Sequence, residues 1–291
     1  TCLKDARTRG YDETLVLGGS AALTVSGDLK TNATLQALVT GTSIARDLWV
    51  GGDDPLSKSS TLPTHSEVAF YDAFMPTLFP GSVQEILDLG RYGFEMSRYS
   101  GLWVAFKIVT NVADEIGTAE VHPERVVIRD PGFTWEGKPW RPTQNPMLLP
   151  PYGLELEREI HYGRLDAARA SAAAHPLNKI TIPSPGAWLG IAAPGKTYYD
   201  LREALRELGL DDEALRRYGI RLLKLGLLWP MEPTIVREFA HRLGGIFVVQ
   251  GKSAFVETFI RDVLYNQAER PRVVGKQDEQ GRPLVPANGE L

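Results

Sequence analysis

The stretch DLWVGGDDP at residues 47–55, together with GLWVAFKIV at residues 101–109, decides the fold. Both are short apolar runs rich in β-branched and aromatic residues, which is typical of buried strands. Between them the pattern predicts, in order, a polar loop, a helix and a short strand, over residues 56–64, 65–75 and 76–79. A further helix then leads into the closing run. Strands alternating with helices over short connections predict a parallel sheet covered by helices.

The last helix of this stretch has clear signals at both ends. Ser82 can cap its start, with Glu85 three residues on as the partner in a capping box. Gly101 stands where a left-handed residue would end it. The helical spacing predicts one apolar face, made of Val83, Ile86, Leu87, Gly90 and Phe94.

The loop from Asp53 to Thr64 is the first place to look for chemistry, because ligands of parallel sheets bind beyond the carboxyl ends of the strands. Asp53 and Asp54 are candidates for an acid/base pair or metal ligands; alternatively, they cap a turn at the strand end. Four further loop residues can hold an anion or form a solvated surface: Lys58, Ser59, Ser60 and Thr61. His65 is either a proton carrier or an ordinary surface histidine.

No single catalytic residue follows from the sequence. The remaining histidines have no metal-ligand spacing and are interpreted as ordinary residues: His122, His161, His175 and His241. No metal site is predicted within the chain, and no G-x-S-x-G elbow suggests serine hydrolysis.

Composition excludes several classes of protein. The chain has 36 acidic and 32 basic residues and a formal charge of −4, without a basic stripe for nucleic acid. No apolar run approaches the roughly 18–20 residues of a membrane span. Cys2 is the single cysteine, so a disulfide or a cysteine-ligated cluster within the chain is impossible, and the reducing cytoplasm is the expected location. A start at Thr1 without Met suggests an engineered start, a trimmed chain or a piece of something longer.

The chain divides into four predicted parts. An α/β domain covers residues 1–130, followed by a Pro-rich linker and a helix over 131–178, a second α/β domain over 179–270 and an extended tail over 271–291. In the first part a strand is expected at 14–17, a turn at 18–20, a helix at 35–44 and a strand at 125–129. The linker should form no element before a helix at 154–174.

The second α/β domain repeats the strand–helix order. Its strands are predicted at 187–193, 217–225 and 245–249, and its helices at 198–208, 233–243 and 255–266. Four tryptophans in apolar runs are predicted to be core: Trp49, Trp103, Trp188 and Trp229.

The stretch GIAAPGKT at residues 190–197 matches the P-loop pattern and opens an alternative, a P-loop NTPase. A strand precedes it and a helix follows. Against it, the apolar strand continues through Gly190, so this glycine does not begin a loop. Gln250-Gly251 also follows the strand at 245–249, where a magnesium-binding aspartate would be needed.

A longer series of motifs runs in one order through the chain. It comprises Gly52-Asp53-Asp54, Lys58-Ser59-Ser60-Thr61-Leu62-Pro63, Ser66-Glu67, Tyr92-Gly93-Phe94, Met96-Ser97-Arg98, Leu189-Gly190-Ile191, Gly195-Lys196, Trp229-Pro230, Glu232-Pro233, Lys252, Leu264-Tyr265-Asn266 and residues 270–276. This series resembles the thiamine-diphosphate-dependent 2-oxoacid:ferredoxin oxidoreductases, and most closely the fused indolepyruvate ferredoxin oxidoreductases. The matching parts are the pyrimidine-binding and transketolase-C-like domains.

The resemblance implies oxidative decarboxylation of an aryl 2-oxoacid, with coenzyme A collecting the acyl group and electrons passing through iron–sulfur clusters to ferredoxin. It implies thiamine diphosphate with Mg²⁺, shared with another domain or chain, and clusters carried only by other domains or partners. Asp53, Asp54, Ser59, Ser60 and Thr61 would line the pocket. It also implies a homo-oligomer or hetero-complex, for which we expect an open half-pocket and an interface beside these strand ends.

The chain also departs from the family pattern. Pro55 replaces a frequent histidine, Thr64-His65 replaces His-Gln, and Gln250-Gly251 replaces a pair of glutamates. The Gly-Val-Asn-Glu segment, the diphosphate–magnesium motif and the cluster cysteines are absent from the sequence. Three readings remain open: a fragment of a fused enzyme, a subunit completed by partner chains, or a non-catalytic assembly subunit.

Overall fold

A computed structural model describes residues 15–16, 48–58, 60–122, 124–143, 147 and 149–289. The helix expected at 35–44 and the turn at 18–20 lie outside the described residues. The strand expected at 14–17 is present as β1 (Leu15–Val16). Within the described part, no helix combines the length and the apolar character that crossing a membrane requires.

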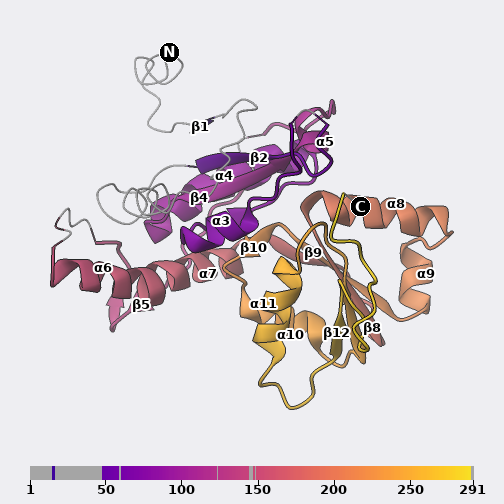
Figure 1. Ribbon diagram of the computed structural model, residues 1–291. Coiled ribbons are helices and arrows are strands. Elements are labelled where there is room, and N and C mark those ends of the chain that lie inside the picture. Colours follow the sequence, from indigo (N-terminus) through magenta and orange to yellow (C-terminus); the bar gives the residue numbers. More distant parts are fainter. Residues whose placement is uncertain are drawn as a thin grey trace.

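The first sheet has the strand order β1-β2-β4-β3-β10. Its central strands β2 (Leu48–Asp53) and β4 (Val104–Val109) run parallel in a register that pairs Leu48 with Val104 and Asp53 with Val109. The short strand β3 (Thr77–Leu78) joins β4 in parallel. The predicted parallel α/β sheet is therefore present (Figure 1).

Helices cover both faces of this sheet because each strand alternates its side chains. On one face, α3 (Glu67–Asp72) packs so closely that a Cβ on Gly51 would lie 2.5 Å from the Phe70 ring. On the other face, α4 (Val83–Ser100) lies over Leu48 and Val104, and Gly93 is its point of closest approach. Lys107 stands on the α3 face, since Ala105 on the same face packs in a cluster with Phe70.

Both predicted ends of α4 are confirmed. The Ser82 hydroxyl accepts the Glu85 N–H, and Gly101 ends the helix with φ of 78°. The predicted apolar face is wrong in part: Leu87 is 47 % exposed, and the buried face runs instead through Leu89, Tyr92, Gly93 and Met96. The buried face differs from the predicted one because the small residues Gly93, Ser97 and Ser100 are buried as well.

The segment between the two sheets has more structure than the sequence suggests. Residues 125–129 form no strand, and the Pro-rich stretch contains a hairpin of β5 (Thr134–Trp135) and β6 (Lys138–Pro139) around buried Trp140. The helix expected at 154–174 is continuous but mixed: α6 (Tyr152–Glu159), a π-helical segment η1 (Ile160–Arg164) and α7 (Leu165–Ala174). In Figure 1, α6 and the hairpin project from the body as an arm.

The second sheet has the order β12-β11-β8-β9-β7. The expected strands are β8 (Leu189–Pro194), β9 (Ile220–Leu225) and β11 (Gly245–Val248), all parallel. The expected helices are α8 (Gly195–Glu207), α10 (Pro233–Ala240) and α11 (Phe255–Leu264). The prediction missed antiparallel β7 (Asn178–Ile182), helix α9 (Asp212–Arg217) and β12 (Arg272–Val274), which pairs with β11 from the tail.

One further prediction needs correction. Trp188 is 60 % exposed, because it lies before β8 at the sheet end, whereas Trp229 is buried and Trp49 and Trp103 are half-buried. The proposed division at residue 179 stays a prediction. Strand β10 (Leu227–Trp229) follows the second sheet's β9, yet it pairs antiparallel with β3 in the first sheet.

The carboxyl edges of the two sheets meet along a seam. The residues after β2 contact those after β11: Lys252 Nζ donates to the Pro55 carbonyl at 2.5 Å. The residues after β3 contact those after β8, where a Cβ on Gly81 would lie 2.4 Å from the Gly195 carbonyl oxygen. The strand ends that we expected to border an open half-pocket therefore face the second sheet.

Candidate functional site

A buried group of charges lies at the carboxyl edge of the first sheet. Lys107, 5 % exposed on β4, forms an ion pair with Glu67 on α3, and its Nζ lies 3.4 Å from Asp53 Oδ2 at the end of β2. The Phe79 ring covers the ammonium group, with Nζ 4.6 Å from the ring centroid. Three elements thus bring one cation and two carboxylates together away from water.

Charge pairing outweighs burial in this group. Burial alone would lower the pKa of Lys107, but attraction to Glu67 and then to Asp53 exceeds that effect and raises it. Burial alone would raise the pKa of Glu67, yet Lys107 and His65 hold it well below its ordinary value. Lys107 and Glu67 therefore form a charged pair at neutral pH.

Asp53 also joins the strand end to the start of α3. Its carboxylate accepts hydrogen bonds from the Ser66 backbone N–H at 3.0 Å and from the Ser66 hydroxyl at 2.5 Å. Its carbonyl accepts the Thr110 hydroxyl at the start of α5 (Thr110–Ala113). Asp53, 2 % exposed, holds these elements in place and has no open side toward the solvent.

His65 connects this group to the second sheet. Its Nε2 lies 3.0 Å from Glu67 Oε2 and 2.8 Å from the Ser253 hydroxyl oxygen, beyond β11. Because Nε2 carries at most one proton, it can donate to only one of these two oxygens at a time. When it accepts from Ser253 instead, the buried Glu67 Oε2 has no other hydrogen-bond donor among the described residues. His65 is therefore placed to hold a proton at the seam.

Asp54 organises the loop. Its carboxylate oxygens accept the backbone N–H groups of Lys58 and Ser60, both at 2.8 Å. Its own N–H donates to the Thr64 hydroxyl at 2.6 Å, and its carbonyl accepts the N–H groups of Ser57 and Thr64. This is the turn-capping role that the sequence left as an alternative to acid/base chemistry.

The other predicted site residues lie farther out. Lys58 and Thr61 are exposed, and the Lys58 ammonium donates to the Asn111 side chain on α5. The Ser60 hydroxyl donates to the Leu62 carbonyl at 2.9 Å. Ser59 lies outside the described residues. The structure thus connects Asp53 to His65 through Lys107 and Glu67, and it places Asp54 and Ser60 in the loop that follows β2.

Two buried polar atoms beside the seam have no partner among the described residues: Ser57 Oγ and Gln250 Nε2. The Gln250 carbonyl side of the same amide accepts the Val256 N–H. Such orphaned groups are where a ligand can bond. No group of three or more His, Cys, Asp or Glu side chains able to hold a metal occurs in the described ranges.

The P-loop reading has no structural basis. Strand β8 runs through Gly190 to Pro194 and α8 begins at Gly195, so no loop is left to wrap around phosphates. Gly190 is a packing residue, because a Cβ there would lie 2.6 Å from the Phe239 ring. Lys196 pairs with Asp200 one turn along α8, at 2.7 Å.

Sequence reasoning named Glu67 only as part of a motif and did not name Lys107 as a site residue. A signal for Lys107 was present: it is the one charged residue in the apolar run at 101–109. A lysine in a strand that is buried on both faces needs a carboxylate partner. The partner could not be found from the sequence, because Glu67 is 40 residues away.

Comparison with known proteins identifies relatives over most of the chain. Residues 179–291 match the family model described as the indolepyruvate oxidoreductase domain. Indolepyruvate oxidoreductase subunit IorA of Methanothermobacter marburgensis is 26 % identical over 229 residues, which is 79 % of this chain and 35 % of that protein. The IorA subunit of Pyrococcus horikoshii is 28 % identical over 218 residues, 73 % of this chain and 31 % of that protein.

The fold has a counterpart among solved structures. A 2-oxoglutarate:ferredoxin oxidoreductase from Magnetococcus marinus, solved with 2-oxoglutarate, coenzyme A and succinyl-CoA, superimposes with a TM-score of 0.56. The identity is 14 %, over 88 % of this chain and 50 % of that one, so the likeness concerns the fold. This chain spans about a third of the length of the curated relatives it matches. The resemblance drawn from the motif series is confirmed.

Proposed function

We propose that this chain, a member of the 2-oxoacid:ferredoxin oxidoreductase family, forms the pyrimidine-side half of the active site of an indolepyruvate or aryl 2-oxoacid:ferredoxin oxidoreductase. The single observation that carries the proposal is the buried Asp53–Lys107–Glu67–His65 group at the carboxyl edge of the first sheet. A carboxyl edge is where parallel sheets bind their ligands.

In this proposal the remaining parts of the site come from another domain or chain. Thiamine diphosphate would supply a nucleophilic carbon for chemistry at the keto carbon of the substrate, and coenzyme A would take the acyl group. The magnesium–diphosphate site would be held elsewhere and shared across an oligomeric complex. Iron–sulfur clusters and ferredoxin contacts belong to those other parts, and the cytoplasm remains our proposed location.

The chain's own residues would position the charged side chains of the site and exclude water from them. Lys107 fixes Glu67 and Asp53 in one orientation, and Asp54 folds the loop of residues 53–64 over them. His65 connects Glu67 with Ser253 across the seam. The unpaired Ser57 hydroxyl can donate or accept a hydrogen bond, and the unpaired Gln250 Nε2 can donate one, to a ligand that enters from the seam. Lys58, Ser59, Ser60 and Thr61 would line the entrance.

Binding of thiamine diphosphate to the 291-residue chain tests the pocket. Titration with and without Mg²⁺, followed by NMR, should shift the amides of the loop at 53–64 and of residues 250–253. The binding should be weak and insensitive to Mg²⁺, because the proposal assigns the magnesium–diphosphate part of the site to another domain or chain. Gln250→Ala should weaken it, whereas Gln280→Ala in the exposed tail serves as the matched control.

Activity separates the partial role from a complete enzyme. Indolepyruvate-dependent reduction of a viologen dye should be absent with this chain alone and should appear only when the remaining domains of the enzyme are added. Turnover by the chain alone, or tight Mg²⁺-dependent binding, would overturn the partial role. If the NMR signals of the loop amides do not shift, the proposed ligand pocket is wrong.

A further inference from the structure

A short loop, residues 249–254, leads from β11 into α11 at the seam. It contains Gly251-Lys252-Ser253, and the backbone N–H groups of residues 251–255 have no acceptor among the described residues. The first N–H groups of a helix, together with the partial positive charge of its N-terminus, attract anions. The side chains around this helix start give independent reasons to expect a ligand there.

Gln250 supplies a buried donor that lacks an acceptor. The residue is 3 % exposed, and its Oε1 accepts the Val256 N–H at 2.9 Å. This bond fixes the orientation of the amide, because only its carbonyl oxygen can face an N–H group. The Nε2 group of the same amide therefore lies beside the first turn of α11, and it has no partner in the described part of the chain. The oxygen of a bound ligand would satisfy it.

Two ammonium groups flank the loop. Lys252 Nζ donates to the Pro55 carbonyl at 2.5 Å. Lys276 Nζ donates to the carbonyls of Gln250 and Pro286, at 2.5 Å and 2.6 Å. Because an ammonium group has three donors, each lysine keeps at least one for a ligand.

The positive charge of this pair is not cancelled by the nearby carboxylate. Glu257, in the first turn of α11, accepts the Lys276 backbone N–H at 2.9 Å and forms an ion pair with Arg261 at 2.6 Å. Burial lowers the pKa of Lys276 to about 8; attraction to Glu257 opposes this effect, and repulsion from Lys252 adds to it. The two lysines are therefore close enough to repel each other, and an anion bound to both would relieve that repulsion.

We propose that the loop of residues 250–255, with Lys252 and Lys276, binds a phosphate group, either the free ion or that of a small phosphate ester. Two ammonium groups and a row of N–H groups suit a dianion, and lysine is a common phosphate ligand. Gly251 leaves room for it, since a Cβ there would meet nothing within 4 Å.

The family pattern does not imply this site. Two glutamates stand in that pattern where this chain has Gln250-Gly251, and their charges would repel a phosphate group. The inference also does not depend on the proposed function, because its probe is inorganic phosphate and not the thiamine cofactor.

Titration of the full 291-residue chain with inorganic phosphate, followed by NMR at neutral pH and constant ionic strength, tests the site. The amides of residues 251–255 should shift and saturate. Acetate, which carries a single charge, should bind roughly tenfold more weakly. Glycerol phosphate should shift the same amides if the site accepts an ester, whereas shifts with the free ion alone would assign the site to inorganic phosphate.

Gln250→Glu separates binding from folding, because it keeps an acceptor for the Val256 N–H, removes the unpaired donor and adds a negative charge. It should raise the Kd for phosphate by roughly tenfold or more. Its free energy of unfolding in urea should not fall, since a carboxylate is favourable at a helix start. Lys252→Met should also raise the Kd by roughly tenfold, through the loss of a charge-assisted hydrogen bond.

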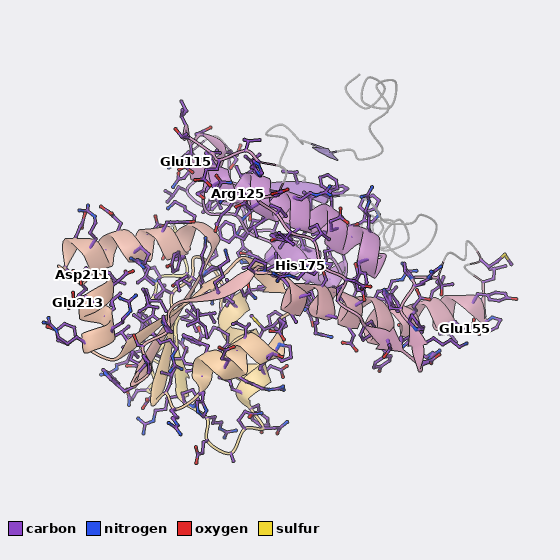
Figure 2. All side chains as sticks on the ribbon, turned by 180° about the vertical axis from the view of Figure 1, so that it is seen from behind. Glu115, Arg125, Glu155, His175, Asp211 and Glu213 are labelled. Atoms are coloured by element: carbon purple, nitrogen blue, oxygen red, sulfur yellow. The ribbon has the colours of Figure 1, made fainter. Side chains whose placement is uncertain are left out.

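Arg216→Gln on α9 is the matched control, because it lowers the net charge by the same amount at the outer edge of the molecule, marked by Glu213 in Figure 2. The proposal is wrong if phosphate leaves the amides of residues 251–255 unchanged, if acetate binds as tightly as phosphate, or if Gln250→Glu binds phosphate as tightly as the parent chain. Equal weakening by Arg216→Gln and Lys252→Met would show a general effect of net charge and would also overturn it.

Discussion

At the scale of single residues, the buried lysine is the most informative feature. Lys107 lies between Glu67 and Asp53 with almost no contact with water, so removing its charge leaves two buried carboxylates facing each other. Breaking a buried ion pair by removing one partner costs about 3–5 kcal/mol. We predict that Lys107→Met lowers the free energy of unfolding in urea by this amount at neutral pH. Lys179→Met, on exposed Lys179 in β7, should change it little.

The pH dependence of that loss follows from Glu67. Its pKa in the folded protein lies below the ordinary value of 4.5, so its contribution to stability is present above 4.5 and is lost as the pH falls. Without Lys107, Glu67 can protonate on acidification. The gap between the parent and Lys107→Met should therefore be widest near neutrality and narrow in acid. A gap that stays constant below pH 4.5 would show that packing, and not charge, causes the loss.

Residue-scale prediction from sequence succeeded where the signal is local. Ser82 and Gly101 were identified as caps because a cap acts on backbone groups within a few residues. The partner of Lys107 and the contact between His65 and Ser253 were not identified, since these pairs are brought together only by the parallel register and the seam. The sequence allowed Asp54 either a turn-capping role or a role in acid/base chemistry. Only the positions of the Lys58 and Ser60 N–H groups identify the capping role.

At the scale of elements, the seam depends on glycines that let two strand ends approach. Gly195 begins α8 with φ of 42°, and a Cβ there would lie 2.4 Å from the Phe79 ring. We predict that Gly195→Ala destabilises the protein both through its backbone and through crowding, the second adding about 1–3 kcal/mol. Gly209→Ala is the matched control, because Gly209 also has positive φ but would meet nothing within 4 Å.

The two alanine variants should differ in their free energy of unfolding, measured by thermal or urea denaturation. This difference isolates the cost of crowding at position 195. Phe79→Leu should partly restore Gly195→Ala by making room, while it should not help Gly209→Ala. Equal losses of stability in Gly195→Ala and Gly209→Ala would mean that the two sheets are not closely packed at the seam. Gly195 also explains why the P-loop pattern misleads. This glycine allows the two sheets to approach closely, and a sequence motif does not show such a contact.

Elements were predicted well where periodicity was long and poorly where strands were short. The helices α4, α8 and α11 were located within a few residues. The hairpin of β5 and β6 has two residues in each strand, too few for an alternation to be visible. Strands β7 and β12 were missed because an edge strand is defined by its neighbour in the sheet, which its own sequence does not reveal.

At the scale of the whole molecule, two features join the two sheets: strand β10, which follows β9 of the second sheet but pairs within the first, and a common apolar core. Strand β10 pairs with β3, with Leu227 opposite Leu78, and the Phe79 N–H donates to the Gly226 carbonyl at 2.7 Å. One apolar cluster contains Leu48 and Phe106 of the first sheet together with Phe239 and Val248 of the second part. Separate unfolding of either part would expose this cluster and leave the edge of β3 unpaired.

We therefore predict that the described part of the chain unfolds in one transition. Leu222→Ala tests this, because fully buried Leu222 belongs to a separate cluster under α8, remote from the first sheet. The substitution should cost about 2–5 kcal/mol. In native-state hydrogen exchange the amides of Ala105 in β4 and Ile246 in β11 should lose protection by the same amount. Loss at Ile246 alone would show two independent units, and it would place the boundary of folding between the sheets despite β10.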